Sequence, residues 1–352
     1  MRDGPRRCRG PSRSSTEDAP LAGARGNSSE SRTLIAYIVR RLFQLVIVLF
    51  GVTLITFGML KLVPGDPAVA LAGKNATPEK IAYVRHERGL DRPFYIQYVK
   101  YVERLLHGDL GESLYTARPV ADMIREAAPV TIQLAVAAVL IELLGIPLGV
   151  YSALRQYSFW DTTLTTLALI IWGIPVFVLG YFAMYIFGLK LNLLPIGGAG
   201  LPYVLGIFPS SWNSFTYLIL PALTLGIIEV AYISYMQRAS MLEVSRSDFI
   251  RTARAKGLSE RKVIWGHGFK NAVIPVMTIA GIDLGALIGG AIITETVFSR
   301  PGIGLMIYHA IGQRDIAVIA GGVLFATFFF VFANLLVDLG YAWVDPRVRL
   351  ED

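Results

Sequence analysis

The stretch VTIQLAVAAVLIELLGIPLGVYSAL at residues 130–154 decides the fold. It carries no Lys or Arg, and its one acidic residue is Glu142. A helix needs roughly 20 predominantly apolar residues to cross a hydrocarbon core of about 30 Å, and this stretch is longer than that. It therefore predicts a membrane-spanning helix.

Five further apolar stretches are long enough for the same role. Their predicted ranges are 37–62, 162–187, 217–237, 276–294 and 316–342. The whole chain agrees with them, because 54% of its 352 residues are hydrophobic and only 17% are charged. Its mean hydropathy of +0.52 lies outside the range of ordinary soluble domains. We predict an all-α polytopic membrane protein with six transmembrane helices.

Two features indicate how the chain is threaded through the membrane. Residues Leu193 to Pro209 are rich in glycine and proline, which favours an external loop or a re-entrant segment over a continuous helix. Short cytoplasmic loops carry an excess of Lys and Arg. With the N-terminus inside, the inner segments carry eleven of these residues and the outer short loops carry three, Lys190, Arg300 and Arg314. Both termini are therefore expected in the cytoplasm.

The spans divide the chain into segments. Residues 1–36 are polar and lack the apolar core of a secretory signal, which predicts a disordered cytoplasmic tail. The other predicted segments are a first transmembrane helix at 37–62, an extracytoplasmic cap at 63–129, a five-helix core at 130–344 with a cytoplasmic loop at 238–275, and a cytoplasmic C-terminus at 345–352.

The cap has helical signals of its own. Its run FYIQYVKYVERLL has an apolar face at helical spacing, formed by Phe94, Tyr98, Tyr101, Val102 and Leu105. We expect a small folded unit on the outer surface. Its tyrosines either pack locally at the membrane interface, where aromatic rings settle, or contact substrate directly.

The loop RASMLEVSRSDFIRTARAKGLSERKVIWGHGFKNAVIP at residues 238–275 is the most informative stretch. One short helix is predicted through Ala255, ended by a left-handed cap at Gly257, and a second helix is predicted to start from Ser259 as its N-cap. We expect a helix-turn-helix that lies flat beneath the membrane and docks against a partner. A solvated basic loop held at anionic lipid is the alternative.

Several short motifs follow one another in a specific order. They are LVPGDP at 62–67, GLDRP at 89–93, GDLG at 108–111, RTARAKG at 251–257, ETVF at 295–298, PGIG at 301–304 and DPR at 345–347. With these motifs the chain from Tyr37 to Arg349 resembles the B-type permease subunit of dipeptide and oligopeptide importers, which are binding-protein-dependent ABC importers of the MetI-like transmembrane family. The loop is similar to the cytoplasmic coupling loop, or EAA loop, of that family.

The resemblance implies a type I ABC importer permease fold with an extracytoplasmic cap after the first helix. It further implies one permease subunit of an ATP-driven peptide importer in a bacterial inner membrane, forming half of the translocation path. The implied partners are a second homologous permease subunit, two ATP-binding subunits, an extracytoplasmic solute-binding protein and membrane lipid, without nucleic acid.

The resemblance also implies roles for particular residues. The helix that couples to the ATPase subunit comprises Asp248, Phe249, Arg251, Thr252, Ala253, Arg254, Ala255, Lys256 and Gly257. The general pattern of this loop begins with Glu, and Arg251 stands in that place here, as is usual in the peptide-importing branch. Candidate contacts with the solute-binding protein are Tyr95, Tyr98 and Tyr101.

ATP chemistry is expected on the partners, with no cofactor bound by this chain. A phosphate-binding loop ends in Gly-Lys-Ser/Thr, whereas Gly73-Lys74 is followed by Asn75. ATP and Mg are therefore expected on the ATP-binding subunits. No metal site is expected either, because Cys8 is the only cysteine and the four histidines are scattered.

Acidic residues at membrane depth bear on the translocation path. A charge at the centre of a spanning helix costs about 2.5–3.5 kcal/mol, so such residues tend to face the bundle interior or a wet path. The residues of this kind are Glu142, Glu229, Asp283 and Asp338. Glu229 and Asp283 are the candidates for the path, and hydrogen bonding to neighbouring helices is the alternative.

Other functions stay open at this point. The same family includes permeases for nickel chelates, glutathione and some sugars. An ion-coupled secondary transporter would use the buried acids as relays, but it would also show a repeated half-structure, which the motifs do not. An enzymatic role lacks a site, since Leu90 stands where the second His of an H-E-x-x-H motif would follow His86.

Overall fold

The computed structural model describes residues 26–62, 68–69, 76–87, 89–200, 203–204, 208–209 and 212–344. The motif at 345–347, the expected C-terminal segment at 345–352 and most of the motif at 62–67 lie outside these ranges.

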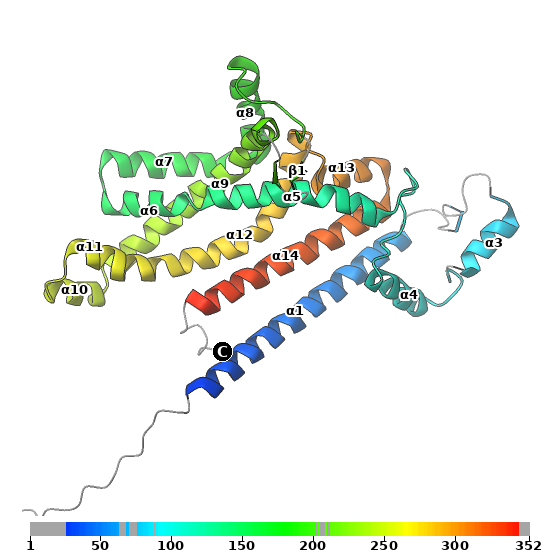
Figure 1. The fold of residues 1–352 in the computed structure, drawn as a ribbon, viewed down its shortest axis with the longest axis horizontal. Coiled ribbons are helices and arrows are strands. Elements are labelled where there is room, and N and C mark those ends of the chain that lie inside the picture. Colours follow the sequence, from blue (N-terminus) through cyan, green and yellow to red (C-terminus); the bar gives the residue numbers. More distant parts are fainter. Residues whose placement is uncertain are drawn as a thin grey trace, which may run out of the picture.

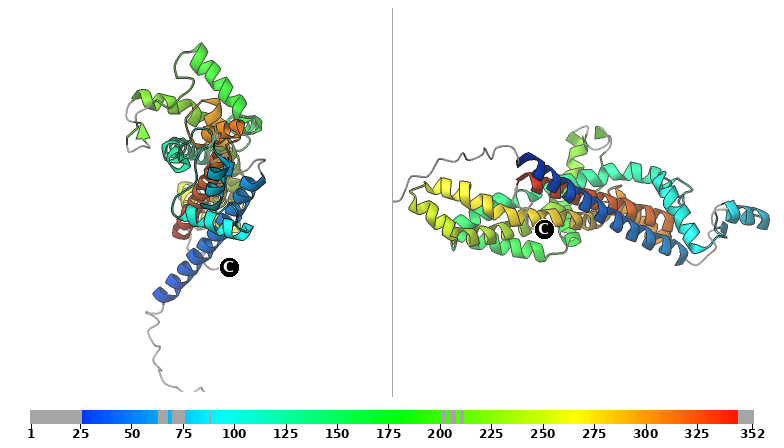
Figure 2. Two further views of the ribbon diagram at one scale, coloured as in Figure 1. Left: turned by 90° about the vertical axis from the view of Figure 1, so that its right-hand side faces the viewer. Right: turned by 90° about the horizontal axis from the view of Figure 1, so that it is seen from below.

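Long helices that run along the molecule make up most of the described structure (Figure 1). Their bounds are α1 (Gly26–Leu62), α5 (Val120–Glu142), α6 (Gly145–Leu154), α7 (Phe159–Gly173), α9 (Trp212–Ser245), α12 (Phe269–Val297) and α14 (Ile316–Val344). The first and last of these, α1 and α14, lie side by side (Figures 1 and 2).

Short elements occupy the two ends of this bundle. One end, called the loop end below, holds α10 (Asp248–Ala255), α11 (Glu260–Lys262) and the π-helix η2 (Val263–Gly268). The opposite end, called the cap end, holds α3 (Pro78–Glu87), α4 (Phe94–Leu106) and α13 (Ile303–Gln313). Between α7 and α9 lie α8 (Val176–Ala183), the π-helix η1 (Met184–Lys190) and a two-stranded antiparallel pair, β1 (Tyr203–Val204) and β2 (Phe208–Pro209).

The helices have the length and composition of membrane spans. Four stretches among the described residues are long and apolar enough to cross a membrane, namely Leu42–Lys61, Val120–Leu154, Ser214–Ser245 and Ile316–Leu335. The pair Phe159–Gly173 and Val176–Lys190 makes a fifth if it counts as one span. The prediction of an all-α polytopic membrane protein is confirmed. The count of six, which needs α12 as well, stays a prediction.

Two of the expected spans are interrupted. The third bends by 104° between α7 and α8, so that α8 projects from the body of the molecule (Figure 1). The bend follows from Pro175, because a proline disfavours helical backbone at the preceding residue, and Ile174 is extended at φ −88° and ψ 128°. The second span has a local irregularity at Leu143 and Leu144, where Pro147 has no N–H to donate to the carbonyl of Leu143 and the N–H of Ile146 donates to it at 3.3 Å.

Several predicted boundaries are corrected. Helix α1 begins at Gly26, so residues 26–36 are helical and not part of a disordered tail, while residues 1–25 lie outside the described part of the chain. The cap ends at Pro119, because α5 begins at Val120 and continues through Pro129. The loop at 238–275 is shorter than expected, since α9 continues to Ser245 and α12 begins at Phe269. Extending an existing helix costs much less than nucleating one, which explains all three shifts.

The cap packs against the end of α1. The predicted apolar face of α4 does so with Tyr98, Tyr101, Val102 and Leu105 around the buried Phe57. The hydroxyl of Tyr98 lies 2.9 Å from Oγ1 of Thr53, and that of Tyr101 lies 3.2 Å from Oγ1 of Thr56. Tyr98 and Tyr101 thus pack locally, which is the first of the two interpretations given for the cap tyrosines.

Candidate coupling site

The helix-turn-helix at the loop end starts from a short local pattern. Ser247 is extended at φ −70° and ψ 153°, and α10 begins after it with Asp248 in the first turn, where a negative charge suits the helix dipole. Gly257 adopts φ +76° directly after α10, so the predicted left-handed cap is confirmed. Ser259 occupies the N-cap position of α11, also as predicted, but its side chain makes no capping hydrogen bond.

One face of α10 is buried within the loop. Ile250 and Ala253 pack with Val263 of η2, and Val244 and Leu258 surround them. Because this small core holds α10 against η2, and η2 continues directly into α12, the helix is attached to the bundle through both ends. Ala253, expected among the coupling residues, therefore supports the helix from beneath.

The other face of α10 is open. Phe249 is 45% exposed and adds an apolar ring to this otherwise charged surface. The remaining predicted coupling residues are exposed as well, namely Asp248, Arg251, Thr252, Arg254, Ala255, Lys256 and Gly257. Together with Phe249 they form the surface called the α10 face below.

Two ion pairs form within the loop. The guanidinium of Arg254 donates from Nε to Oε1 of Glu260 at 2.9 Å, across the turn at Gly257. Arg251 lies 3.4 Å from Asp248 within α10. Both pairs are solvent-exposed, so each contributes at most about 1 kcal/mol to stability. The first one links α10 to α11 across the turn.

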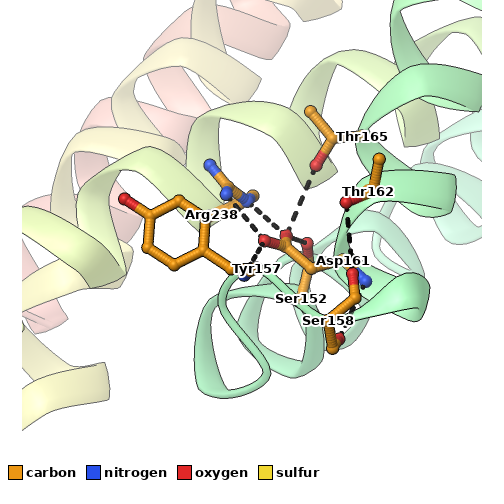
Figure 3. A network of polar contacts seen from close by, with 7 residues as sticks. All are labelled: Ser152, Tyr157, Ser158, Asp161, Thr162, Thr165 and Arg238. Atoms are coloured by element: carbon orange, nitrogen blue, oxygen red, sulfur yellow. Dashed lines mark hydrogen bonds and ion pairs between the residues drawn. The ribbon is translucent and has the colours of Figure 1, made fainter.

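A buried polar network lies where α9 enters the loop, and Figure 3 shows it. The guanidinium of Arg238 on α9 donates two hydrogen bonds to Asp161 on α7, from Nε to Oδ1 at 2.6 Å and from Nη2 to Oδ2 at 2.8 Å. The hydroxyl of Ser152 on α6 donates to Oδ1 as well, and the backbone N–H of Tyr157 donates to Oδ2 at 2.9 Å. Three helices therefore meet at one carboxylate.

Asp161 was not among the residues that the sequence indicated. Its side chain is only 3% exposed, and that of Arg238 is 20% exposed. The available signal was a carboxylate at the start of an apolar stretch, next to the N-cap Ser158. The partner stands 77 positions away, so no local pattern connects the two residues.

The acidic residues at membrane depth are brought together. Ala138, Leu225 and Leu287 belong to one hydrophobic cluster between α5, α9 and α12. One helical turn from each, on the side of the loop end, stand Glu142, Glu229 and Asp283 respectively, so the packing of the three helices gathers these carboxyl groups in one region.

These carboxylates differ in exposure. Glu142 is almost fully buried, whereas Glu229 and Asp283 are half-buried. Oε1 of Glu142 and Oδ2 of Asp283 have no hydrogen-bond partner among the described residues. Both candidates for the path, Glu229 and Asp283, therefore lie in the same region of the bundle as Glu142. The side chain of Asp338 lies outside the described part of the chain.

The motifs ETVF and PGIG take part in a second buried polar network, at the cap end. Oε2 of Glu295 accepts hydrogen bonds from the N–H groups of Gly304 at 2.7 Å and Leu305 at 3.3 Å, which caps the start of α13. The buried Arg300 donates to the carbonyl of Tyr217 and to Oε1 of Gln133, both at 2.9 Å. The motifs therefore join α5, α9, α12 and α13.

Metal chemistry has no support in this arrangement. Within the described ranges, no group of three or more His, Cys, Asp or Glu side chains is placed to hold a metal ion.

Long apolar helices, with an exposed helix-turn-helix between two of them, define a multi-pass membrane protein. Comparison with known families gives the class more closely. Residues 145–350 match the family described as the inner membrane component of binding-protein-dependent transport systems, and residues 34–135 match the N-terminal family of such components. The chain belongs to this family.

Individual relatives match over almost their whole length. The dipeptide transport system permease protein DppB of Alkalihalophilus pseudofirmus is 42% identical over 332 residues, which cover 90% of this chain and 100% of the relative. The di/tripeptide transport system permease protein DppB of Pseudomonas aeruginosa and the dipeptide transport system permease protein DppB of Escherichia coli are each 38% identical, covering 90% of this chain and 99% of the relative.

Proposed function

We propose that this chain is one transmembrane permease subunit of an ATP-driven importer of dipeptides or oligopeptides. The observation that carries the proposal is the α10 face, an exposed surface on a rigid support between two long apolar helices. Relatives that match over nearly their full length and are named for peptide transport support the substrate class.

The α10 face is the docking surface for an ATP-binding subunit. Phe249 supplies an exposed apolar anchor, and the cationic Arg251, Arg254 and Lys256 surround it. A buried aromatic anchor with a polar rim is a common arrangement in protein interfaces. This chain has no phosphate-binding loop, so ATP and Mg bind to separate subunits. Two such subunits complete the importer.

Docking at this place can move the spans. The small core around Ile250 and Ala253 keeps α10 rigid, so a push on α10 is transmitted and not absorbed by a flexible loop. The push reaches α9 at one end of the loop and α12 at the other. These two helices also carry Glu229 and Asp283, the candidate path residues.

The proposal includes the remaining parts of the importer. A second, homologous permease subunit supplies the other half of the path, and an external solute-binding protein delivers the solute at the cap end. Both termini and the loop end face the cytoplasm. Of the three candidate tyrosines, Tyr95 is the one open to the binding protein, since it is 67% exposed while Tyr98 and Tyr101 contact α1.

The test is reconstitution of the complete importer in proteoliposomes. We expect the solute-binding protein loaded with a di- or oligopeptide to stimulate ATP hydrolysis and to drive peptide accumulation. The same binding protein without peptide is the control. Stimulation only by a different solute would overturn the peptide assignment, and uptake that persists after ATP depletion with a proton gradient in place would overturn the ATP-driven mechanism.

A further inference from the structure

The place where Arg238 meets Asp161 is a joint between the coupling loop and the spans. Arg238 lies on α9, and the same helix continues without a break to Ser245, just before α10. Asp161 lies near the start of α7, and Ser152 near the end of α6. The network in Figure 3 therefore ties two other helices to the part of α9 that carries the loop.

The geometry of this joint is stiff. A guanidinium that donates two parallel hydrogen bonds to one carboxylate fixes orientation as well as distance, in contrast to a single flexible contact. The N–H of Tyr157 occupies the carboxylate from a third direction, and Tyr157 itself has φ +62°, so the turn between α6 and α7 is shaped around Asp161.

Contacts farther along the helices complete the attachment. Gly149 of α6 lies so close to α9 that an added Cβ would stand 2.5 Å from the carbonyl oxygen of Ser234, so the two helices pack backbone to backbone here. Trp172 of α7 stacks on Tyr232 of α9 with ring centroids 5.4 Å apart. Helix α7 is thus held to α9 at two levels, by the ion pair at the loop end and by the ring pair farther in.

We propose that Asp161 and Arg238 are positioning residues that make α6, α7 and α9 move as one body with the coupling loop. This inference rests on the proposed function, because it concerns how a push on α10 reaches the spans. The ion pair passes the displacement of α9 to α7, and α7 passes it to the bent arm of α8 and η1. With the pair broken, only the ring pair farther in still holds α7 to α9, so most of the displacement at the loop end no longer reaches α7.

The experiment compares transport with ATP use in the complete reconstituted importer. Asp161→Asn keeps the size of the side chain but removes its charge, and Arg238→Lys keeps the charge but cannot hold both carboxylate oxygens. We expect the number of peptides transported per ATP hydrolysed to fall on the order of tenfold in Asp161→Asn. Arg238→Lys should fall less, while peptide-stimulated ATP hydrolysis persists in both variants.

Two controls separate coupling from stability. Thr165→Val removes a neighbouring hydroxyl that lies 3.5 Å from Asp161 and leaves the ion pair in place, so its ratio should match the wild type. Leu134→Ala truncates a fully buried side chain of α5 away from the joint, so it should lower Tm with an unchanged ratio per assembled importer.

The outcomes are distinct. An unchanged ratio in both Asp161→Asn and Arg238→Lys overturns the positioning role while the proposed function stands. A ratio that falls equally in Leu134→Ala overturns it too, because loss of stability would then explain the effect. Absence of peptide-stimulated ATP hydrolysis in the wild-type importer overturns the proposed function, and this inference with it.

Discussion

At the scale of single residues, the buried polar network at the cap end explains why two glycines stand in the motif PGIG. A Cβ added to Gly302 would lie 2.3 Å from the carboxyl carbon of Glu295, and one added to Gly304 would lie 2.4 Å from Cα of Ile292. Contacts below 3.0 Å force atoms to move. Glu295 cannot move away without losing the start of α13.

Gly302→Ala is therefore expected to destabilise the protein by about 1–3 kcal/mol, as overpacking of a filled interior does. The measurement is thermal unfolding of the purified protein in detergent. Gly312→Ala, near the other end of α13, is the control, because nothing lies within 4 Å of its added Cβ. Equal Tm values for the two variants would contradict the steric explanation.

Tyr101 makes the stability of the cap depend on pH. Burial raises the pKa of Tyr101 above its ordinary value of about 10, so the hydroxyl stays neutral in the folded protein after it ionises in the unfolded chain. The stability contributed by this residue is complete below about pH 10 and is lost as the pH rises through the folded pKa.

Compared with Tyr101→Phe, the wild type should therefore lose Tm more steeply above about pH 10, and the gap between them should be constant from about pH 7 to 9. Melting curves across this range measure the gap. Tyr95→Phe, at an exposed position of the same helix, is the control. A gap that stays constant through pH 11 would refute the expected burial effect.

At the scale of elements, the α10–α11 turn depends on backbone freedom at Gly257. Nothing lies within 4 Å of a Cβ added there, so a larger side chain meets no neighbour. Its φ of +76° is the obstacle, because left-handed backbone costs about 1–2 kcal/mol for an ordinary residue. Asn adopts this conformation more readily.

Gly257→Val should therefore reduce peptide transport per ATP hydrolysed, whereas Gly257→Asn should retain most of it. The reconstituted importer provides the measurement, and quantitative membrane blots check that both variants insert. Equal loss in Val and Asn variants would indicate that the side chain, and not the backbone, is what the partner rejects.

Arg254 has two possible contributions, and Glu260 separates them. Arg254→Glu removes a cation from the α10 face and also breaks the ion pair across the turn, whereas Glu260→Gln breaks the same pair and leaves the cation. We expect Arg254→Glu to uncouple transport from ATP hydrolysis and Glu260→Gln to transport within about twofold of wild type, because exposed pairs contribute little. Uncoupling by Glu260→Gln would assign the effect to the turn.

Local sequence patterns predicted most of the helices but not the contacts between them. Apolar length was enough to predict the four long apolar stretches found among the described residues, and Gly257 was enough to place the turn in the loop. The bend at Pro175 was missed because the apolar composition continues on both sides of it. The pairing of Asp161 with Arg238 depends on how α7 and α9 pack, which hydropathy does not encode. The same holds for the burial of Ala253, since its partner Val263 belongs to another element.

At the scale of the whole molecule, the loop end and the cap end should lie on opposite sides of the membrane. Single cysteines at Lys256 and Leu106 test this, since Lys256 is exposed at the loop end and Leu106 is 83% exposed at the cap end. The native Cys8 is first replaced by Ser. Impermeant maleimide on spheroplasts should label Leu106→Cys, and Lys256→Cys should react only after permeabilisation. The reverse pattern would invert the proposed orientation.

The length of α9 has a consequence for where the ATP-binding subunit meets the membrane. At about 1.5 Å per residue, its 34 residues extend about 51 Å, while a bilayer with its headgroups is about 40–45 Å thick. The charged residues Arg238, Glu243 and Arg246 lie at or just beyond the loop end of this helix, so the surplus length falls there. We therefore expect the α10 face to stand clear of the lipid headgroups, where a soluble ATP-binding subunit can bind it without displacing phospholipid.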